Sequence, residues 1–413
     1  MKKFIHKIYA YSFFNQLGFV YPFIAIIFQD YGLSATQIAI VIASMYVTQF
    51  VTEIPSGALA DKFNRKWVLI SSQICKIIGF GIWIFIPNFW GFLIGFSMLG
   101  LRQSLNSGCY EAFIYDELKD AKKDNLYTKI LGRQGAFSTI ASGTAAITAA
   151  YMITNGYDFV LWASIASSLV AVLVMLVIET VPKVDDIEEH VADYITTLKE
   201  GVKYSINHKT VFKLLLFSSF TLFINVGYLD YFEIFLKEIV LNLSLVAIIC
   251  GLFEFVFAIG NWCAEYFNKI KTKNLVFIYV IAAIVDIVTF TIYKFPISIV
   301  LVFTNGLIIS AVYVNFNHKT NDYIPKNIRA TTLSMGGFVT GFGSMIVLLI
   351  FGRVVDIAGS YQIGFLTFAY MYAIGSILFY FWIRSDKLLD KKEKMEEHPV
   401  YLESEKEHFR DNI

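Results

Sequence analysis

Twelve apolar stretches, each about as long as a helix must be to cross a bilayer, constrain this chain more than any other feature. Hydrophobic residues make up 56% of the chain and charged residues only 16%, against about 25% charged in soluble domains. The sequence therefore predicts an all-α membrane protein with twelve transmembrane helices. By windowed hydropathy they span roughly 8–29, 36–60, 67–88, 90–114, 128–153, 158–179, 211–236, 244–267, 274–294, 297–318, 330–352 and 360–383.

The distribution of Lys and Arg tests this count, because cytoplasmic loops are enriched in both residues and a missed helix would invert every later loop. With both termini inside, 29 of the 34 Lys and Arg residues fall on cytoplasmic segments and three on the other side. The other two, Lys76 and Arg102, lie inside predicted helices. We expect a multi-pass protein of the cytoplasmic, or inner, membrane with both termini cytoplasmic. The net charge of +1 gives no indication of nucleic-acid binding.

The connection after the sixth helix is the longest, and it divides the chain into two sets of six helices. We predict an N-terminal bundle at 1–180, a cytoplasmic amphipathic linker at 181–210, a C-terminal bundle at 211–384 and a charged cytoplasmic tail at 385–413. The two halves also match in layout at an offset of about 202 residues, which makes the bundles pseudo-symmetric. Leu131 and Gly135, for example, correspond to Leu333 and Gly337.

One short motif lies between the second and third predicted helices. Residues 57–69 read G-A-L-A-D-K-F-N-R-K-W-V-L, and they resemble the cytoplasmic loop signature of the major facilitator superfamily. Residues 53–56, 107–116 and 329–334 resemble the same superfamily. Asn64 stands where glycine is usual, and we expect it to keep the turn because asparagine tolerates a left-handed backbone.

The resemblance implies a set of gate residues at the cytoplasmic ends of the helices. It implies that Asp61 caps the eleventh helix, which starts near Arg329, and that Arg65 pairs with Asp116 of the fourth helix. A plainer interpretation is that these charges only flank helices, as cytoplasmic charges usually do. The predicted cytoplasmic gate comprises Gly57, Asp61, Arg65, Lys66 and Asp116.

Ionisable residues inside predicted helices are candidates for proton coupling, because a charge facing lipid is costly. Arg102 resembles an arginine that the superfamily links to proton transfer, with a structural hydrogen-bonding role as the alternative. Glu233 lies one turn after Asp230 and could also pair with Lys237. Such buried carboxyl groups can bind and release protons. The candidates are Arg102, Asp230, Glu233 and Glu254. We expect Lys76 and Asp286 to serve structure.

The resemblance also places the substrate between the first, fourth, seventh and tenth helices. Their amides and tyrosines, among many phenylalanines, would suit an amphipathic organic molecule. The cavity candidates are Asn15, Gln16, Tyr21, Asn106, Tyr110, Asn225, Tyr228, Asn305 and Tyr313.

The function implied is secondary active transport by alternating access, specifically proton-coupled efflux of a drug or metabolite by a monomeric antiporter. Proton-coupled uptake by a symporter is the alternative, and a non-transporting membrane sensor is a remote one. The motifs of metalloproteases, serine hydrolases, P-loop pumps and CxxC redox proteins do not occur in the sequence, so we expect no enzyme. The expected partners are a small-molecule substrate, protons and the lipid bilayer, with no cofactor and no metal.

Overall fold

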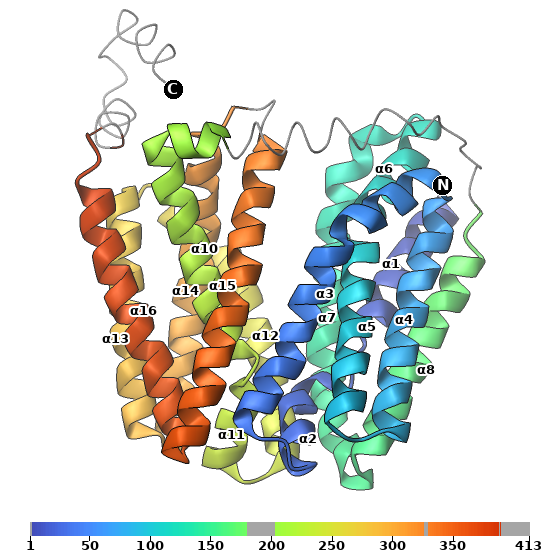
Figure 1. Cartoon of the computed structure of the whole chain (residues 1–413). Helices are drawn as coiled ribbons and strands as arrows, with labels where there is room; N and C mark the ends of the chain where they lie inside the picture. Colours follow the sequence, from blue (N-terminus) through green and yellow to red (C-terminus); the bar gives the residue numbers. More distant parts are fainter. Residues whose placement is uncertain (1, 180–202, 326–328, 388, 390–413) are drawn as a thin grey trace, which may run out of the picture. The chain divides into compact units, whose positions relative to one another are not determined.

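The computed structural model of the protein describes residues 2–179, 203–325, 329–387 and 389 (Figure 1). Within these ranges the regular structure is entirely helical. Eleven segments are long and apolar enough to cross a membrane, and α5 (Phe89–Asn106) holds the place of the remaining helix. The predicted all-α fold with twelve transmembrane helices is confirmed. The predicted domain boundaries stay predictions, and most of the linker and the tail lies outside the described residues.

The first half of the chain contains six predicted spans. The first span is built from α1 (Lys2–Gln16), a 3-10 turn (Tyr21–Phe23) and α2 (Ile24–Asp30). The others are α3 (Ala35–Lys62), α4 (Arg65–Phe85), α5 followed by α6 (Cys109–Asp120), α7 (Tyr127–Met152) and α8 (Tyr157–Leu176).

The second half repeats this pattern of long helices with short connections. Its helices are α10 (Lys209–Leu229) followed by α11 (Phe232–Val240), α12 (Leu243–Trp262), α13 (Thr272–Ile292), α14 (Ile297–Asn321), α15 (Arg329–Ala358) and α16 (Tyr361–Arg384).

Contacts between residues group the described chain into two compact units. The first unit holds α1–α8 together with 227–258 and 348–364 from the second half of the chain. The second unit holds the other described parts, 203–226, 259–325, 329–347, 365–387 and 389. Segments of α10, α11, α12 and α15, and the start of α16, therefore pack in the same unit as the first six spans.

Three spans that the hydropathy predicts as continuous are interrupted. The first breaks at Gly18, where a Cβ would lie 2.2 Å from the ring of Tyr21. The fourth breaks at Gly108, whose φ of +66° lies in the left-handed region that favours glycine. The seventh turns between α10 and α11 at Asp230. Hydropathy averages over such breaks, but in transporters they expose backbone and polar side chains inside the membrane.

Helix starts follow ordinary capping chemistry. Ser34 begins α3 with a capping box, in which its hydroxyl accepts from Gln37 N and Gln37 Oε1 accepts from Ser34 N at 2.9 Å. Asn64 begins α4 by accepting from the backbone N of Lys66. Its φ is −56°, so the prediction of a left-handed Asn64 is wrong, and capping explains the residue instead.

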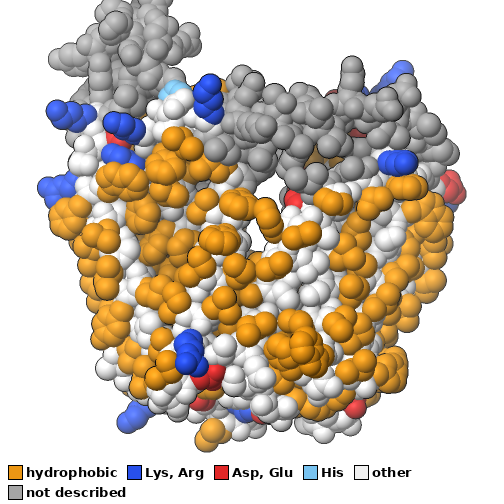
Figure 2. Space-filling view, viewed as in Figure 1, with side chains coloured by type: hydrophobic (Ala, Val, Ile, Leu, Met, Phe, Trp, Pro, Cys, Tyr) orange, Lys and Arg blue, Asp and Glu red, His pale blue; other side chains and the backbone are white. Residues whose placement is uncertain are grey.

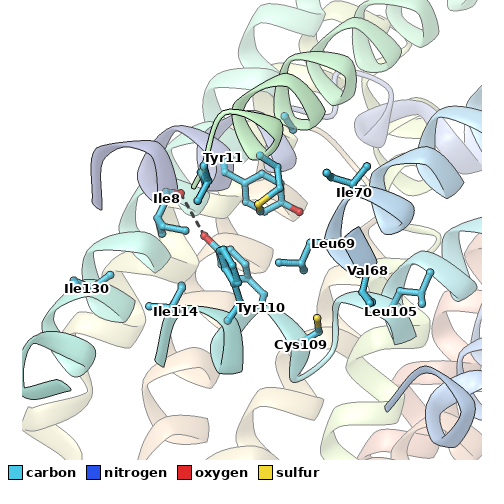
Figure 3. Close-up of a cluster of buried hydrophobic side chains, with 14 of the residues drawn as sticks. Ile8, Tyr11, Val68, Leu69, Ile70, Leu105, Cys109, Tyr110, Ile114 and Ile130 are labelled. Carbon is cyan, nitrogen blue, oxygen red and sulfur yellow. Dashed lines mark hydrogen bonds between the residues drawn. The ribbon is translucent and has the colours of Figure 1, made fainter. Parts of the chain in front are cut away.

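A buried apolar cluster holds α1, α4, α5, α6, α7 and α8 together. Figure 3 shows Tyr110 packed between Ile8, Leu69 and Ile114, with its hydroxyl directed to the carbonyl oxygen of Ile8. By contrast, many large apolar side chains lie on the surface, such as Trp90. Apolar side chains cover most of the surface seen in Figure 2, and Lys and Arg lie towards the helix ends. This surface suits a lipid environment.

Candidate functional site

The predicted cytoplasmic gate centres on the start of α4. Arg65 forms an ion pair with Asp116 of α6, as the motif implied. Lys66 donates to the backbone oxygens of Leu176 (2.8 Å) and Ile178 (2.6 Å) at the end of α8, where a cation interacts favourably with a helix C-terminus. The loop signature thus connects α4 to α6 and to the end of α8.

Two further gate residues make no contact that the structure describes. Gly57 lies in α3, and a Cβ added there would meet no described atom within 4 Å. The motif suggests close helix packing at this glycine, and no such packing is present among the described residues. Asp61 also belongs to α3, but its side chain lies outside the described set, so the cap on α15 stays a prediction.

A polar cluster with two cations lies within the helices of the first half; we call it the Asn15 cluster. The side-chain oxygen of Asn15 on α1 accepts from Gln73 Nε2 of α4 and from Arg102 Nη2 of α5, both at 2.7 Å. Lys76 Nζ donates to the backbone oxygen of Asn15 at 2.8 Å and lies 5.4 Å from the ring centroid of Tyr21. One asparagine therefore accepts hydrogen bonds from two positively charged side chains.

The carboxyl groups predicted to carry protons lie in segments of the second half that belong to the first unit. Asp230, at the break between α10 and α11, accepts a hydrogen bond from the hydroxyl of Tyr46 on α3 at 2.9 Å. Glu233 is partly buried, and its Oε2 has no hydrogen-bond partner among the described residues. Glu254 on α12 interacts with the hydroxyl of Ser142 on α7. The part of the chain that the structure describes provides no ion pair for any of the three.

Additional contacts join the two halves at the helix ends predicted to face outward. Asp356, near the end of α15, accepts from the Ser34 hydroxyl (2.9 Å) and from the backbone N of Ala35 (2.9 Å) and Thr36 (3.0 Å). A carboxylate at a helix N-terminus is stabilised by the unpaired N–H groups and by the helix dipole. Asp356 therefore binds the start of α3.

Two neighbouring residues strengthen this junction. The hydroxyl of Tyr231 donates to the Ala35 oxygen at 2.8 Å, and Lys237 forms an ion pair with Asp30 at the end of α2. A Cβ at Gly352 of α15 would lie 2.6 Å from the Ala35 oxygen, so the approach of the two helices requires a glycine here. We call the contacts made by Asp356, Tyr231 and Lys237 the outer network. The described ion pair of Lys237 is with Asp30 and not with Glu233, the alternative that the sequence left open.

The predicted cavity residues fall in different surroundings. Asn15 and Tyr21 belong to the Asn15 cluster, and Asn106 lies one turn beyond Arg102. Tyr110 is buried in the apolar cluster, where its hydroxyl lies 2.6 Å from that of Ser12. Gln16, Tyr228 and Tyr313 are partly buried.

Two predicted cavity asparagines in the second unit donate hydrogen bonds to other residues of that unit. Asn225 Nδ2 donates to the backbone oxygen of Thr221 at 2.6 Å. Asn305 on α14 is buried and donates to Asp286 of α13 at 2.6 Å and to the Ala282 oxygen at 3.2 Å. The expectation that Asp286 serves structure fits this contact. A role for any of these residues in substrate binding stays a prediction.

The partners that complete these sites could not be identified from the sequence. Gln73, Tyr46 and Asp356 are polar residues on transmembrane helices without a motif. The S-x-x-Q capping box at Ser34 signals the start of α3, and a carboxylate near the end of another span is a natural partner for such a start. No groups of three or more potential metal ligands occur among the described residues.

At the level of sequence, the chain is similar to known transporters. The family model of the Major Facilitator Superfamily matches residues 8–348. An uncharacterized MFS-type transporter of Methanocaldococcus jannaschii is 25% identical over 116 residues, which are 28% of each chain. An uncharacterized transporter of Buchnera aphidicola subsp. Acyrthosiphon pisum is 26% identical over 130 residues, 31% of this chain and 32% of that one. These matches span less than a third of either relative.

Solved structures provide the comparison of folds. A point mutant of the nucleoside transporter NupG superposes with a TM-score of 0.76 at 16% identity, covering 92% of this chain and 99% of that one. A D-xylose-proton symporter gives 0.67 at 10% identity, covering 91% and 96%. A bacterial homolog of the human lysosomal transporter Spinster gives 0.70 at 13% identity, covering 92% and 95%. The chain has the fold of these transporters, and with a family model that matches most of its length it belongs to the Major Facilitator Superfamily.

Proposed function

We propose that the protein is a proton-coupled secondary transporter that exports a small amphipathic organic molecule by alternating access. The observation that carries the proposal is the hydrogen bond from Tyr46 to Asp230. It joins a group that can bind a proton to a helix of the other half of the chain. No basic partner of Asp230 occurs among the described residues, so a proton is the simplest means of neutralising it.

Proton binding at Asp230 would change this contact. An ionised carboxylate accepts a strong hydrogen bond from a hydroxyl, and protonation replaces it with a weaker neutral one. Asp230 directly precedes Tyr231, whose hydroxyl belongs to the outer network. We propose that protonation of Asp230 biases the outer network towards opening. Glu254, one of the predicted carriers, offers a second carboxyl group in α12.

At the other end of the helices, Gly57, Asp61, Arg65, Lys66 and Asp116 would form the cytoplasmic gate. The ion pair of Arg65 with Asp116 supports this role, because it ties the loop signature to α6. We propose that both termini are cytoplasmic, that the membrane is the inner membrane and that the transporter works as a monomer. Labelling of added terminal tags in intact cells tests the orientation, since tags accessible from outside would contradict it.

The test of function uses purified protein in liposomes that contain a pH-sensitive dye. Pools of drugs and metabolites are added without an imposed gradient, and proton movement that depends on a compound is recorded. Asp230→Asn should abolish the signal because the amide cannot bind the proton. The matched control is Asp286→Asn, which changes a carboxyl group bonded to Asn305 and should leave the signal intact.

The sign of the signal separates the directions of transport. Movement of protons against the flow of the compound indicates antiport, which permits export, and movement with the compound indicates uptake by symport. Equal signals from wild type and Asp230→Asn would contradict the assignment of Asp230. Silence from folded protein across the whole panel would favour another coupling ion or a non-transporting sensor.

A further inference from the structure

The first six spans contain two positive charges whose partners are neutral. Lys76 is fully buried and Arg102 is partly exposed, and the structure describes hydrogen bonds from both to Asn15. No ion pair of either residue occurs in the described part of the chain. Glu53 on α3 accepts a hydrogen bond from the Ser107 hydroxyl at 3.1 Å.

Arginine cannot neutralise itself as a carboxyl group does, because its guanidinium stays protonated in proteins. Two positive charges in low-dielectric surroundings also repel each other, and Lys76 and Arg102 both donate to the same residue, Asn15. Asn15 offsets the charge only in part, since an amide oxygen carries a partial charge. An anion that enters the site would complete the neutralisation.

Arg102 also has hydrogen-bonding capacity to spare. Its guanidinium has five N–H donors, and the structure describes a single hydrogen bond, from Nη2 to Asn15. The Nε atom is buried without a partner among the described residues. Asn106 lies one turn along the same face of α5, and its Nδ2 carries two further N–H donors. An amide and a planar fork of donors next to each other suit an oxyanion.

We propose that Arg102, with Asn106 beside it and Lys76 behind it, binds an anionic group of the transported molecule. The group is a carboxylate or a phosphate on a small organic body. The inference rests on the proposed transport function and narrows its substrate to organic anions. Arg102 fixes the anion by direct contact, and Lys76 acts through Asn15 and through its charge.

A purely structural cluster would have a different signature. In that case Arg102 and Lys76 would only tie α4 and α5 to α1, and substituting them would lower stability without changing the response to anions. The two roles therefore differ in a measurement of ligand-dependent stabilisation and not in a measurement of stability alone.

The experiment measures thermal unfolding of the purified full chain in a neutral detergent. The probes are benzoate, salicylate, octanoate, glucose phosphate and adenosine monophosphate, each beside its uncharged counterpart: benzamide, salicylamide, octanamide, glucose and adenosine. We expect at least one anion to raise the unfolding temperature while its counterpart does not. Arg102→Gln should weaken the apparent affinity for that anion about tenfold or more, and Arg102→Lys should weaken it less.

Three results would overturn the inference. Stabilisation by uncharged probes alone, an unchanged response in folded Arg102→Gln, or no response to any of the anions would each exclude an organic-anion site. A further arm adds phosphatidylglycerol, because a lipid headgroup has the same chemistry. If only the lipid stabilises the protein through Arg102, the site binds lipid and a transported anion is excluded. Proton movement driven by uncharged compounds would leave the proposed function intact while this inference fails.

Discussion

Two buried asparagines meet opposite charges in the two halves of the chain. Asn15 turns its oxygen towards Arg102 and Gln73 in the first half, and Asn305 turns its amide nitrogen towards Asp286 in the second. An amide can satisfy either charge, but the charges themselves differ in kind. A carboxyl group can become neutral by binding a proton, whereas a guanidinium cannot lose one. The Asp286 carboxyl group can therefore be neutralised by a proton, whereas neither cation of the Asn15 cluster has an acidic partner among the described residues.

The largest expected effect comes from the same substitution made at both asparagines. Asn15→Asp supplies the Asn15 cluster with a fixed anion, so it should raise the free energy of unfolding by about 1–3 kcal/mol and weaken the binding of added anions by about a hundredfold. Asn305→Asp sets a second carboxyl group beside Asp286 and should lower the free energy of unfolding by a similar amount. Thermal unfolding with and without the anionic probes measures both. If both substitutions changed the free energy of unfolding in the same direction, the two asparagines would not lie in surroundings of opposite charge.

The next effect isolates the charge of Lys76. Lys76→Met keeps the length and apolar body of the side chain but removes its charge, which relieves the repulsion with Arg102. We expect the free energy of unfolding to rise by about 1 kcal/mol and the affinity for an anionic probe to fall about tenfold. A fall in stability together with an unchanged affinity would mean that Lys76 serves packing only. Arg102→Lys, which keeps the charge, provides the control.

Asp356 differs from the carboxyl groups that a proton can neutralise, because neutral hydrogen-bond donors already stabilise its charge. With three hydrogen bonds from the start of α3, it should stay ionised and carry no proton. Asp356→Asn should weaken the outer network by about 1 kcal/mol, increasing the open population about fivefold. Accessibility of a cysteine introduced near Thr36 to a thiol reagent measures this population. The matched control is Asp158→Asn, an exposed carboxyl group in the first turn of α8. Loss of proton movement in Asp356→Asn would contradict the claim that Asp356 stays ionised and carries no proton.

Lys237 gives the smallest effect, since it is a cation that already has an acidic partner. Lys237→Gln removes the ion pair with Asp30, which is partly exposed. This should change the free energy of opening the outer network by only about 0.5 kcal/mol. The response to anionic probes should not change, in contrast to Arg102→Gln. The double variant Asp30→Lys with Lys237→Asp reverses the ion pair and should restore the wild-type population of the open outer network. A large effect of Lys237→Gln on anion binding would show that the presence of an acidic partner does not explain the difference between Lys237 and Arg102.

Much of the fold could be predicted from the sequence because bilayer thickness fixes the length of each apolar stretch. Hydropathy does not predict the breaks at Gly18, Gly108 and Asp230, because it averages over a turn of polar or small residues. The pairing of Arg65 with Asp116 is implied by the resemblance of residues 57–69 to the loop signature of the superfamily, and the structure contains this ion pair.

The partners of the candidate sites were harder to predict. Asn15, Arg102 and Asp230 stood out as polar residues in apolar helices, but the sequence does not state which helix each one faces. Gln73 and Tyr46 lie on other helices at positions that only packing determines. The sequence predicts a structural role for Lys76, and only the packing shows that Asn15 connects it to Arg102.

The most direct test of proton coupling is to compare exchange with accumulation in proteoliposomes. The compound with the largest proton signal in wild type is followed with and without an imposed pH gradient, in wild type and in Asp230→Asn. We expect wild type to accumulate the compound when the gradient is present. Asp230→Asn should still exchange the compound but should lose gradient-driven accumulation. Equal accumulation by the two proteins would contradict proton coupling through Asp230.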